Sequence, residues 1–228
     1  MTKKVAFFDI DGTVFRSSLL IELVQKLVEE KHFPLETEDT YKKEFESWLN
    51  REGSYEEYIG SVVRAFYTHI KGVHYGDVAD IGKVVVQNHS KQVYRYTRDL
   101  IRELKEKNYF VVAISQSPKA ILDEFCNNYG FDKVYGRMYA IGPGDCFTGE
   151  VIDEHVIQNK ANIVARVLER EDVTLEDSVG VGDTEGDIQL LQEVDQPICF
   201  NPNQTLYKHA KRAGWKVVVE RKDVIYEL

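Results

Sequence analysis

A short apolar run near the start of the chain ends in acidic residues and a glycine. Residues 5–8 (VAFF) are followed directly by residues 9–12 (DIDG), and the next comparable run is at 110–114. An unbroken run of this kind is typical of a strand buried on both faces of a parallel sheet, and Asp and Gly mark the turn that ends it. A parallel strand–helix–strand unit needs only about 30 residues. The long separation therefore predicts an α/β sheet with a large insertion after its first strand.

The inserted residues have the pattern of packed helices. Apolar side chains recur at spacings of three and four over 19–28 and again over 45–66, and a weaker pattern of this kind covers 78–88. We therefore divide the chain into a core of residues 1–14 and 91–228 and a helical domain of residues 15–90. Peripheral helices that only decorate the sheet are the alternative.

The rest of the chain alternates strands with helices. Pro118 at a first helical turn, with Ser117 as the N-cap, predicts a helix that runs to about residue 128. Residues 142–145 (GPGD) predict a hairpin between 134 and 151. The fold class that we expect is a Rossmann-like open parallel sheet with helices on both faces. Its further strands are predicted at 110–114, 133–135, 179–182, 197–200 and 216–219, with helices near 93–107, 158–170, 187–194 and 204–213.

Charge and composition exclude several classes of protein. The formal net charge is −9, which repels phosphate backbones and anionic lipids, so we expect neither a nucleic acid nor a membrane as partner. No apolar stretch approaches the roughly 18 residues of a membrane span, and the first residues lack the pattern of a signal peptide. The three cysteines lie far apart without CxxC spacing, which favours a reducing, cytoplasmic location over a disulfide framework or a zinc site.

Polar residues follow the predicted strands at four places. They are residues 9–13 (DIDGT), Ser115, Lys160 at a helix start, and residues 183–187 (DTEGD). In an open α/β sheet, ligands bind beyond the carboxyl ends of the strands, where loops and helix N-termini gather. We therefore expect these four groups to meet in one crevice.

The acidic residues of this crevice require a cation. Two like charges 4 Å apart repel by about 4 kcal/mol at an effective dielectric constant of 20. Clustered carboxylates therefore need compensation, and carboxylate and carbonyl oxygens suit Mg²⁺, which commonly also binds a substrate phosphate. Ser115 and Lys160 supply donors and a positive charge for a phosphoryl group. The predicted metal ligands are Asp9, Asp11, Asp183 and Asp187.

A pocket of this kind can transfer phosphate. One aspartate can accept the phosphoryl group as a covalent aspartyl-phosphate, while a second carboxyl handles the proton of the leaving oxygen. The two-residue spacing of Asp9 and Asp11 brings both carboxyls near one centre, and Gly12 permits the sharp turn that follows. Asp11 is then the general acid and, later, the base for water.

These motifs resemble those of the haloacid dehalogenase superfamily of phosphatases, in the branch similar to phosphoserine phosphatase. Residues 9–14 (DIDGTV) resemble the first motif of the family, Ser115 the second, Lys160 the third and residues 182–187 (GDTEGD) the fourth. The match covers nearly the whole chain. The four fixed residues of DxDGT should occur by chance in only about two chains per thousand of this length.

The resemblance implies specific roles. Asp9 is the nucleophile, and Mg²⁺ is held by Asp9, the backbone carbonyl of Asp11 and Asp183, with Asp187 as a supporting ligand. The phosphoryl group is bound by Ser115 and Lys160, a group to which we add Thr13 and Gln116. Residues 15–90 become a cap over the site. The implied activity is Mg²⁺-dependent hydrolysis of a small phosphorylated metabolite.

The substrate is left open by departures from the family pattern. A substrate-binding glutamate of phosphoserine phosphatases aligns with Ser18, and a cap arginine aligns with Val62, although Arg64 lies nearby. Phosphoserine is therefore one alternative among small phosphate esters. A phospho-accepting, Mg²⁺-binding signalling module without turnover is the alternative from another class. The aromatic residues of the insertion are predicted to be core rather than a ligand box; they are Phe45, Trp48, Tyr55, Tyr58 and Phe66.

Overall fold

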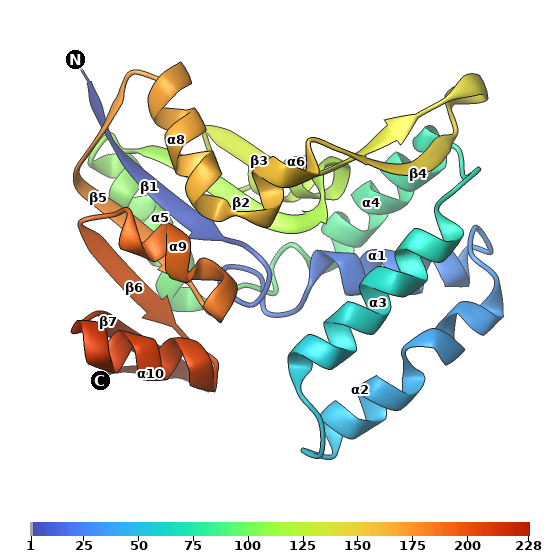
Figure 1. Ribbon diagram of the computed structural model, residues 1–228, viewed down its shortest axis with the longest axis horizontal. Helices are drawn as coiled ribbons and strands as arrows, with labels where there is room; N and C mark the ends of the chain where they lie inside the picture. Colours follow the sequence, from blue (N-terminus) through green and yellow to red (C-terminus); the bar gives the residue numbers. More distant parts are fainter. Residues whose placement is uncertain (1) are drawn as a thin grey trace.

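The structure, a computed structural model, is built on one eight-stranded sheet (Figure 1). It describes residues 2–228, apart from the side chains at positions 156 and 158. The strand order is β4-β3-β2-β1-β5-β6-β7-β8, and all neighbours are parallel except the two outermost pairs, β3–β4 and β7–β8. The strands are β1 (Lys3–Asp9), β2 (Phe110–Pro118), β3 (Lys133–Ile141), β4 (Phe147–Ile152), β5 (Val173–Gly182), β6 (Gln196–Phe200), β7 (Lys216–Arg221) and β8 (Val224–Glu227).

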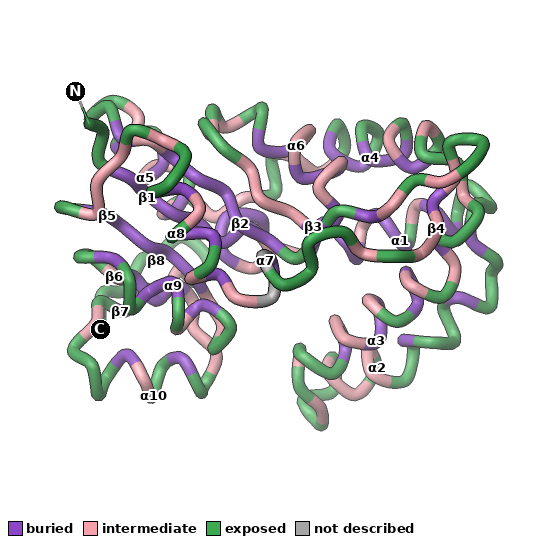
Figure 2. Tube along the Cα trace, turned by 45° about the horizontal axis from the view of Figure 1, so that its top comes forward, coloured by how far each residue is buried: buried purple, intermediate pink, exposed green. Residues whose placement is uncertain are grey.

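Strand β1 shows why helices cover both faces of the sheet. Its successive side chains point to opposite faces, so Val5 and Phe7 enter one apolar cluster while Ala6 and Phe8 enter another. All four are fully buried, and the sheet forms the buried centre of the molecule in Figure 2. Helices α8 (Lys160–Arg170), α9 (Ile188–Gln192) and α10 (Gln204–Ala213) cover the first face, and α5 (Arg95–Glu106) and α6 (Lys119–Asn127) cover the second.

The residues between β1 and α5 are helical, as the apolar spacing predicts. Figure 1 shows α1, α2 and α3 to one side of the sheet, beyond the carboxyl end of β1. Helix α4 packs against α6 and α1, which joins this helical layer to the sheet through one continuous apolar cluster. The helices are α1 (Leu19–Glu29), the 3₁₀ turn η1 (Leu35–Thr40), α2 (Lys42–Leu49), α3 (Tyr55–His69) and α4 (Tyr75–His89).

Each edge of the sheet ends in an antiparallel pair of strands, and the sequence predicts only one of the two pairs. The hairpin is confirmed, because β3 and β4 pair antiparallel across the 3₁₀ turn η2 (Pro143–Asp145). Strand β8 is not predicted, and it pairs antiparallel with β7 at the opposite edge. Its four residues are all exposed, so it lacks the apolar pattern of the buried strands.

The prediction that Ser117 caps a helix is wrong. Strand β2 continues through Pro118, which pairs with Arg137 of β3, and Pro118 itself stands at the N-cap of α6 without a side-chain cap. Ser117 makes a different hydrogen bond, to a residue of the candidate site described below. A proline after a serine fits a strand end as well as a helix start, so local sequence did not separate the two.

The predicted site residues lie where the topology changes direction. Strand β1 sits between β2 and β5, and the chain builds the sheet outward from β1 on both sides. A crevice forms at such a point beyond the carboxyl ends of the strands. Among the described residues, no helix is both long enough and apolar enough to cross a membrane.

Candidate active site

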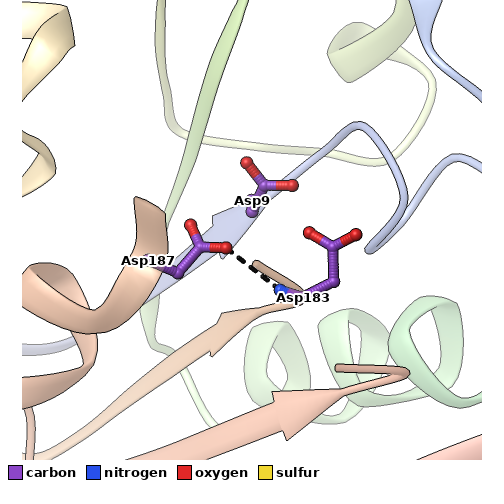
Figure 3. A group of neighbouring side chains, drawn as sticks. All are labelled: Asp9, Asp183 and Asp187. Atoms are coloured by element: carbon purple, nitrogen blue, oxygen red, sulfur yellow. Dashed lines mark hydrogen bonds between the residues drawn. The ribbon is translucent and has the colours of Figure 1, made fainter. Parts of the chain in front are cut away.

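Three carboxylates meet beyond the ends of β1 and β5. Asp9 is the last residue of β1, Asp183 follows β5 directly, and Asp187 ends the 3₁₀ turn η3 (Glu185–Asp187). Each offers an oxygen atom within 4.8 Å of the others, and their side chains converge in Figure 3. The strands that carry Asp9 and Asp183 are hydrogen-bonded neighbours, which explains how residues so distant in the sequence come together.

Asp187 is held rigidly. Its side chain is fully buried, and one carboxylate oxygen accepts hydrogen bonds of 3.0 Å from the backbone N–H groups of Asp183 and Thr184. A side chain at position 182 would enter the space of Asp187, since an added Cβ would lie 2.4 Å from the Asp187 Cγ atom. Gly182 therefore allows the β5 backbone to approach this carboxylate closely.

Lys160 joins two of the three carboxylates. It is the first residue of α8, 6% exposed, and its ammonium group donates to Asp9 over 2.5 Å and also to Asp187. Burial acts to lower the pKa of Lys160, but the charges of Asp187 and Asp9 outweigh it and raise that pKa above its ordinary value. Lys160 is therefore positively charged inside the site. The side chain of Asn159 caps α8 by accepting a hydrogen bond from the Ala161 N–H. This cap fixes the start of the helix and therefore the position of Lys160.

The remaining charge fits a divalent cation. Three carboxylates against one ammonium group leave two negative charges uncompensated in a buried space. Burial raises the pKa of Asp9 to about 7, and burial together with the charge of Asp9 raises the pKa of Asp183 well above its ordinary value. Carboxylate oxygens are the ligands that Mg²⁺ prefers. Asp9 and Asp183, with Asp187 beside them, are therefore a donor set and a charge that suit Mg²⁺.

Asp11 faces the end of β2. One of its oxygens accepts hydrogen bonds from the hydroxyls of Ser115 and Ser117, the latter over 2.8 Å, and the other accepts from the Leu19 N–H over 2.6 Å. Burial raises the pKa of the Asp11 carboxyl, while these hydrogen bonds act to lower it. Sequence reasoning found Asp11 and Ser115 but missed Ser117, whose contact depends on β2 continuing past Ser115.

Two further predicted residues have different surroundings. Thr13 is fully buried, and its hydroxyl has no hydrogen-bond partner among the described residues. Gln116 is exposed, and its carbonyl accepts a 2.7 Å hydrogen bond from Arg137 of β3. Arg137 also donates to the Tyr67 hydroxyl of α3 over 2.7 Å. Gln116 therefore belongs to a contact between the sheet and the inserted helices, a link that local sequence gave no signal for.

A cavity of about 340 Å³ lies between Asp183, with the turn at Gly12, and the inserted helices. Gly12 and Asp183 line its inner end, and aromatic side chains of α2 and α3 line its outer part. The pKa of the Tyr55 hydroxyl is raised by burial and by the negative charges of Asp11 and Asp183, which places that hydroxyl beside the acidic site. The aromatic residues of the wall are Phe45, Trp48, Tyr55, Tyr58 and Tyr94.

The cavity corrects the expectation that the inserted aromatics are only core. Phe66 is 1% exposed and belongs to the apolar core, as predicted, whereas Phe45, Trp48, Tyr55 and Tyr58 serve both as packing and as cavity wall. Helical spacing tells which side of a helix is apolar but not whether that side meets another helix or a space.

The positions that left the substrate open lie outside the cavity wall. Ser18 is the N-cap of α1 and accepts from the Leu20 N–H over 3.3 Å. Val62 is 1% exposed in the core, and Arg64 is exposed on the outer surface of α3. The positions that align with the substrate-binding glutamate and the cap arginine of phosphoserine phosphatases therefore supply no charged group to the cavity.

Comparison with known proteins identifies the family. Residues 6–192 match the model of the haloacid dehalogenase-like hydrolases, and the chain belongs to this family. It is therefore a hydrolytic enzyme of the phosphatase type, in the branch that contains the phosphoserine phosphatases.

Individual relatives are distant. The chain is 22% identical to the phosphoserine phosphatase of Methanocaldococcus jannaschii, over 97% of this chain and 94% of the relative. It is 26% identical to the inhibition of morphological differentiation protein of Streptomyces azureus, over 55% of this chain but only 46% of that longer protein. A solved phospho-aspartyl intermediate analogue of a phosphoserine phosphatase shares the fold, with a TM-score of 0.62 and 21% identity over 98% of this chain and 96% of the other.

Proposed function

We propose that this protein is a Mg²⁺-dependent phosphomonoester hydrolase that acts on a small phosphorylated metabolite through a phospho-Asp9 intermediate. The observation that carries the proposal is the convergence of Asp9, Asp183 and Asp187 around the Lys160 ammonium, with Asp11 beside them at the same sheet edge. The printed name of a structural relative, a phospho-aspartyl intermediate analogue, supports the covalent step.

The first step forms the covalent intermediate. A carboxylate oxygen of Asp9 attacks phosphorus, and the bond from phosphorus to the ester oxygen breaks. Asp11, whose burial favours the protonated form, gives its proton to the departing oxygen, which leaves as an alcohol. Lys160 and Ser115 bind the phosphoryl oxygens, and Lys160 compensates negative charge that builds up on them.

The second step regenerates the enzyme. Asp11, now a carboxylate, takes a proton from a water molecule whose oxygen attacks phosphorus. The bond to Asp9 breaks, and inorganic phosphate forms with Asp9 free again. The Mg²⁺ ion, when bound by Asp9, the Asp11 backbone carbonyl and Asp183, would neutralise this acidic site and polarise the phosphoryl group.

We further propose that residues 15–90 are a cap and that residues 1–14 and 91–228 are the catalytic core. The support is that α1, α2 and α3 form the outer wall of the cavity that begins at Gly12 and Asp183. A cap that closes over the site excludes water and favours small substrates. The net charge of −9 and a cavity of about 340 Å³ support a small metabolite rather than a macromolecular partner. The three widely spaced, free cysteines support a reducing compartment.

The test is phosphate release from p-nitrophenyl phosphate, with Mg²⁺ present or removed by EDTA. We expect activity that EDTA abolishes and Mg²⁺ restores, and an Asp9→Asn variant slowed by at least about 10³-fold, since it loses the nucleophile. Asp80→Asn is the matched control, because Asp80 lies exposed on α4 and pairs only with Lys83 among the described residues. Activity that survives both EDTA and Asp9→Asn would exclude the mechanism. A p-nitrophenol yield that stops at one per chain, with the phosphoryl group retained on the protein, would favour the signalling module instead.

A further inference from the structure

The cavity has two ends with different chemistry. Its inner end is lined by Gly12 and Asp183, which border the acidic site where the phosphoryl group binds under the proposed function. Its outer end holds Glu22 of α1 among the aromatic residues of α2 and α3. A substrate whose phosphoryl group sits beside Asp183 would therefore extend its alcohol part toward Glu22, because Asp183 and Glu22 line one cavity.

Glu22 is a partly buried carboxylate that makes one long contact with a cationic type of side chain, His89. Its side chain is only 17% exposed, and among the described residues no side chain donates a hydrogen bond to it. The Nε2 atom of His89 on α4 lies 3.8 Å from the Glu22 carboxylate, within ion-pair range when the imidazole is protonated but beyond hydrogen-bond distance. The Tyr58 hydroxyl lies close enough that the charge of Glu22, added to burial, raises the pKa of Tyr58 to about 12. A partly buried carboxylate is stabilised further when a positive group or a donor pairs with it.

The wall around Glu22 is made of aromatic rings. Trp48 and Tyr58 stack with their centroids 5.6 Å apart and their planes 18° apart, and Phe45 and Tyr55 pack around the same Tyr58 ring. The face of an aromatic ring carries partial negative charge and attracts cations, most strongly in Trp. A carboxylate and several aromatic rings around one cavity favour positive charge and disfavour negative charge.

The cavity has one further charged residue, and it is placed differently. Arg16 lies in the loop before α1, is exposed, and its guanidinium carbon lies 5.7 Å from the centroid of the Tyr94 ring. Its charge influences Tyr94, near Asp183, rather than Tyr58, near Glu22. Arg16 could therefore bind an anion near Tyr94 and Asp183. The charge at the outer end of the cavity is the negative charge of Glu22.

We propose that the leaving alcohol of the physiological substrate carries a positively charged nitrogen group, an ammonium or an imidazolium, bound by Glu22 and the rings of Trp48 and Tyr58. This inference rests on the proposed function and names its substrate class. An alcohol with a carboxylate beside its ammonium group is disfavoured at the outer end, so the preferred ester is a phosphorylated amino alcohol rather than a phosphorylated amino acid.

The test compares kcat/KM within sets of related phosphate esters. O-phosphoethanolamine carries an ammonium group, histidinol phosphate carries an ammonium group and an imidazole, ethyl phosphate is the neutral counterpart, and phosphoserine adds a carboxylate. We expect the cationic esters to exceed ethyl phosphate by about tenfold to a hundredfold, as one ion pair with cation–π contact allows. Phosphoserine should fall below O-phosphoethanolamine. Equal values for the cationic and neutral esters would overturn the inference.

Variants locate the preference. Glu22→Gln should bring the ratio of cationic to neutral kcat/KM close to one, and Trp48→Leu should lower the same ratio. Glu29→Gln is the matched control on the same helix, since Glu29 is 69% exposed and pairs with Lys26 on the surface, and it should leave the ratio unchanged. Circular dichroism and melting temperature show whether each variant is folded, and the wild-type comparison stands without them.

The outcomes separate the two proposals. Hydrolysis of p-nitrophenyl phosphate without preference for cationic esters would overturn the substrate class and leave the phosphatase mechanism intact. Absence of turnover on p-nitrophenyl phosphate and on every ester would overturn both. A preference for cationic esters that persists in Glu22→Gln would contradict the assigned role of this residue.

Discussion

Asp11 illustrates how single contacts tune an acid. Its carboxyl is buried, which favours the protonated form, yet Ser115, Ser117 and the Leu19 N–H donate hydrogen bonds that favour the ionised form. A group that must first give a proton and then take one needs both forms within reach at neutral pH. The balance between burial and donors therefore decides how well Asp11 performs the two steps.

Removing one donor should shift this balance measurably. In Ser117→Ala the carboxylate of Asp11 loses a hydrogen bond that lowers its pKa, so the pKa rises and the alkaline limb of the pH profile of kcat/KM moves to higher pH. The rate should fall by less than the roughly 10²–10⁴-fold expected for Asp11→Asn.

Ser178→Ala is the control for this change, because it removes another buried serine hydroxyl, one that accepts a hydrogen bond from the Asp195 N–H. It should leave the pH profile where it was. An alkaline limb that stays in place in Ser117→Ala, or moves to lower pH, would contradict the role given to Ser117.

At the scale of elements, the turn after β1 must pass very close to the end of β5. Gly12 has a φ of +82°, and a Cβ atom there would lie 2.2 Å from the Asp183 Oδ2 atom. The turn and the Asp183 carboxylate, a proposed metal ligand, therefore share space that only glycine leaves free.

Gly12→Ala should combine two losses. The positive φ by itself destabilises an alanine by about 1 kcal/mol or more, and displacement of Asp183 should remove the rise in melting temperature that Mg²⁺ produces. Urea unfolding and thermal melts with and without Mg²⁺ measure the two effects.

Gly72→Ala separates them. Gly72 has a nearly identical φ of +84° but nothing within 4 Å of an added Cβ, so it should show the backbone cost and keep the response to Mg²⁺. Retention of a full Mg²⁺ response in Gly12→Ala would show that Asp183 is not needed for the metal.

At the scale of the whole molecule, the acidic site links folding to pH. The pKa of Asp9 is about 7 in the folded protein, above its ordinary value, because burial disfavours the charge. The unfolded chain therefore releases this proton at lower pH than the folded chain does. From about pH 4 to pH 7 the contribution of Asp9 to the free energy of unfolding falls as pH rises, and above pH 7 it changes no further.

Without metal, the protein should therefore lose up to about 4 kcal/mol of stability from this group between pH 4 and pH 7. Mg²⁺ should restore more stability at pH 8, where the carboxylate is ionised, than at pH 5. Urea unfolding in EDTA and in Mg²⁺ at several pH values measures both. Asp9→Asn removes the titrating group, so its stability should change less over this pH window; an identical pH dependence in the variant would show that Asp9 does not titrate there.

Much of the core could be predicted because its signals are local. The run at residues 5–8 is buried on both faces of the sheet, and the acids of 9–11 and 183–187 come directly after strands. In a parallel sheet, such positions meet at one edge whatever the details of packing. The same reasoning placed Lys160 at a helix start, where its ammonium now joins Asp9 and Asp187.

Other residues carried no local signal. The local sequence around Ser117 is as typical of a helix cap as of a strand end. Only the extension of β2 brings Ser117 to Asp11. Arg137 lies in an ordinary strand, and its bonds to Gln116 and Tyr67 depend on how β3, the β2 end and α3 meet. Contacts of this kind depend on the packing of several elements, which periodicity along one element does not specify.

The amino-acid sequence alone determined the order of strands and motifs, and with it the acidic edge of the sheet, since chemistry at a strand end follows from residues that are neighbours in the chain. Only the tertiary structure decided what the inserted helices face. Glu22 lines a cavity, and the rings of Trp48 and Tyr58 form part of its wall while they also pack with the core. The physical reason is that an apolar helix face is buried equally well against a neighbour or around a ligand, and the packing of the helices against the sheet decides which of the two occurs.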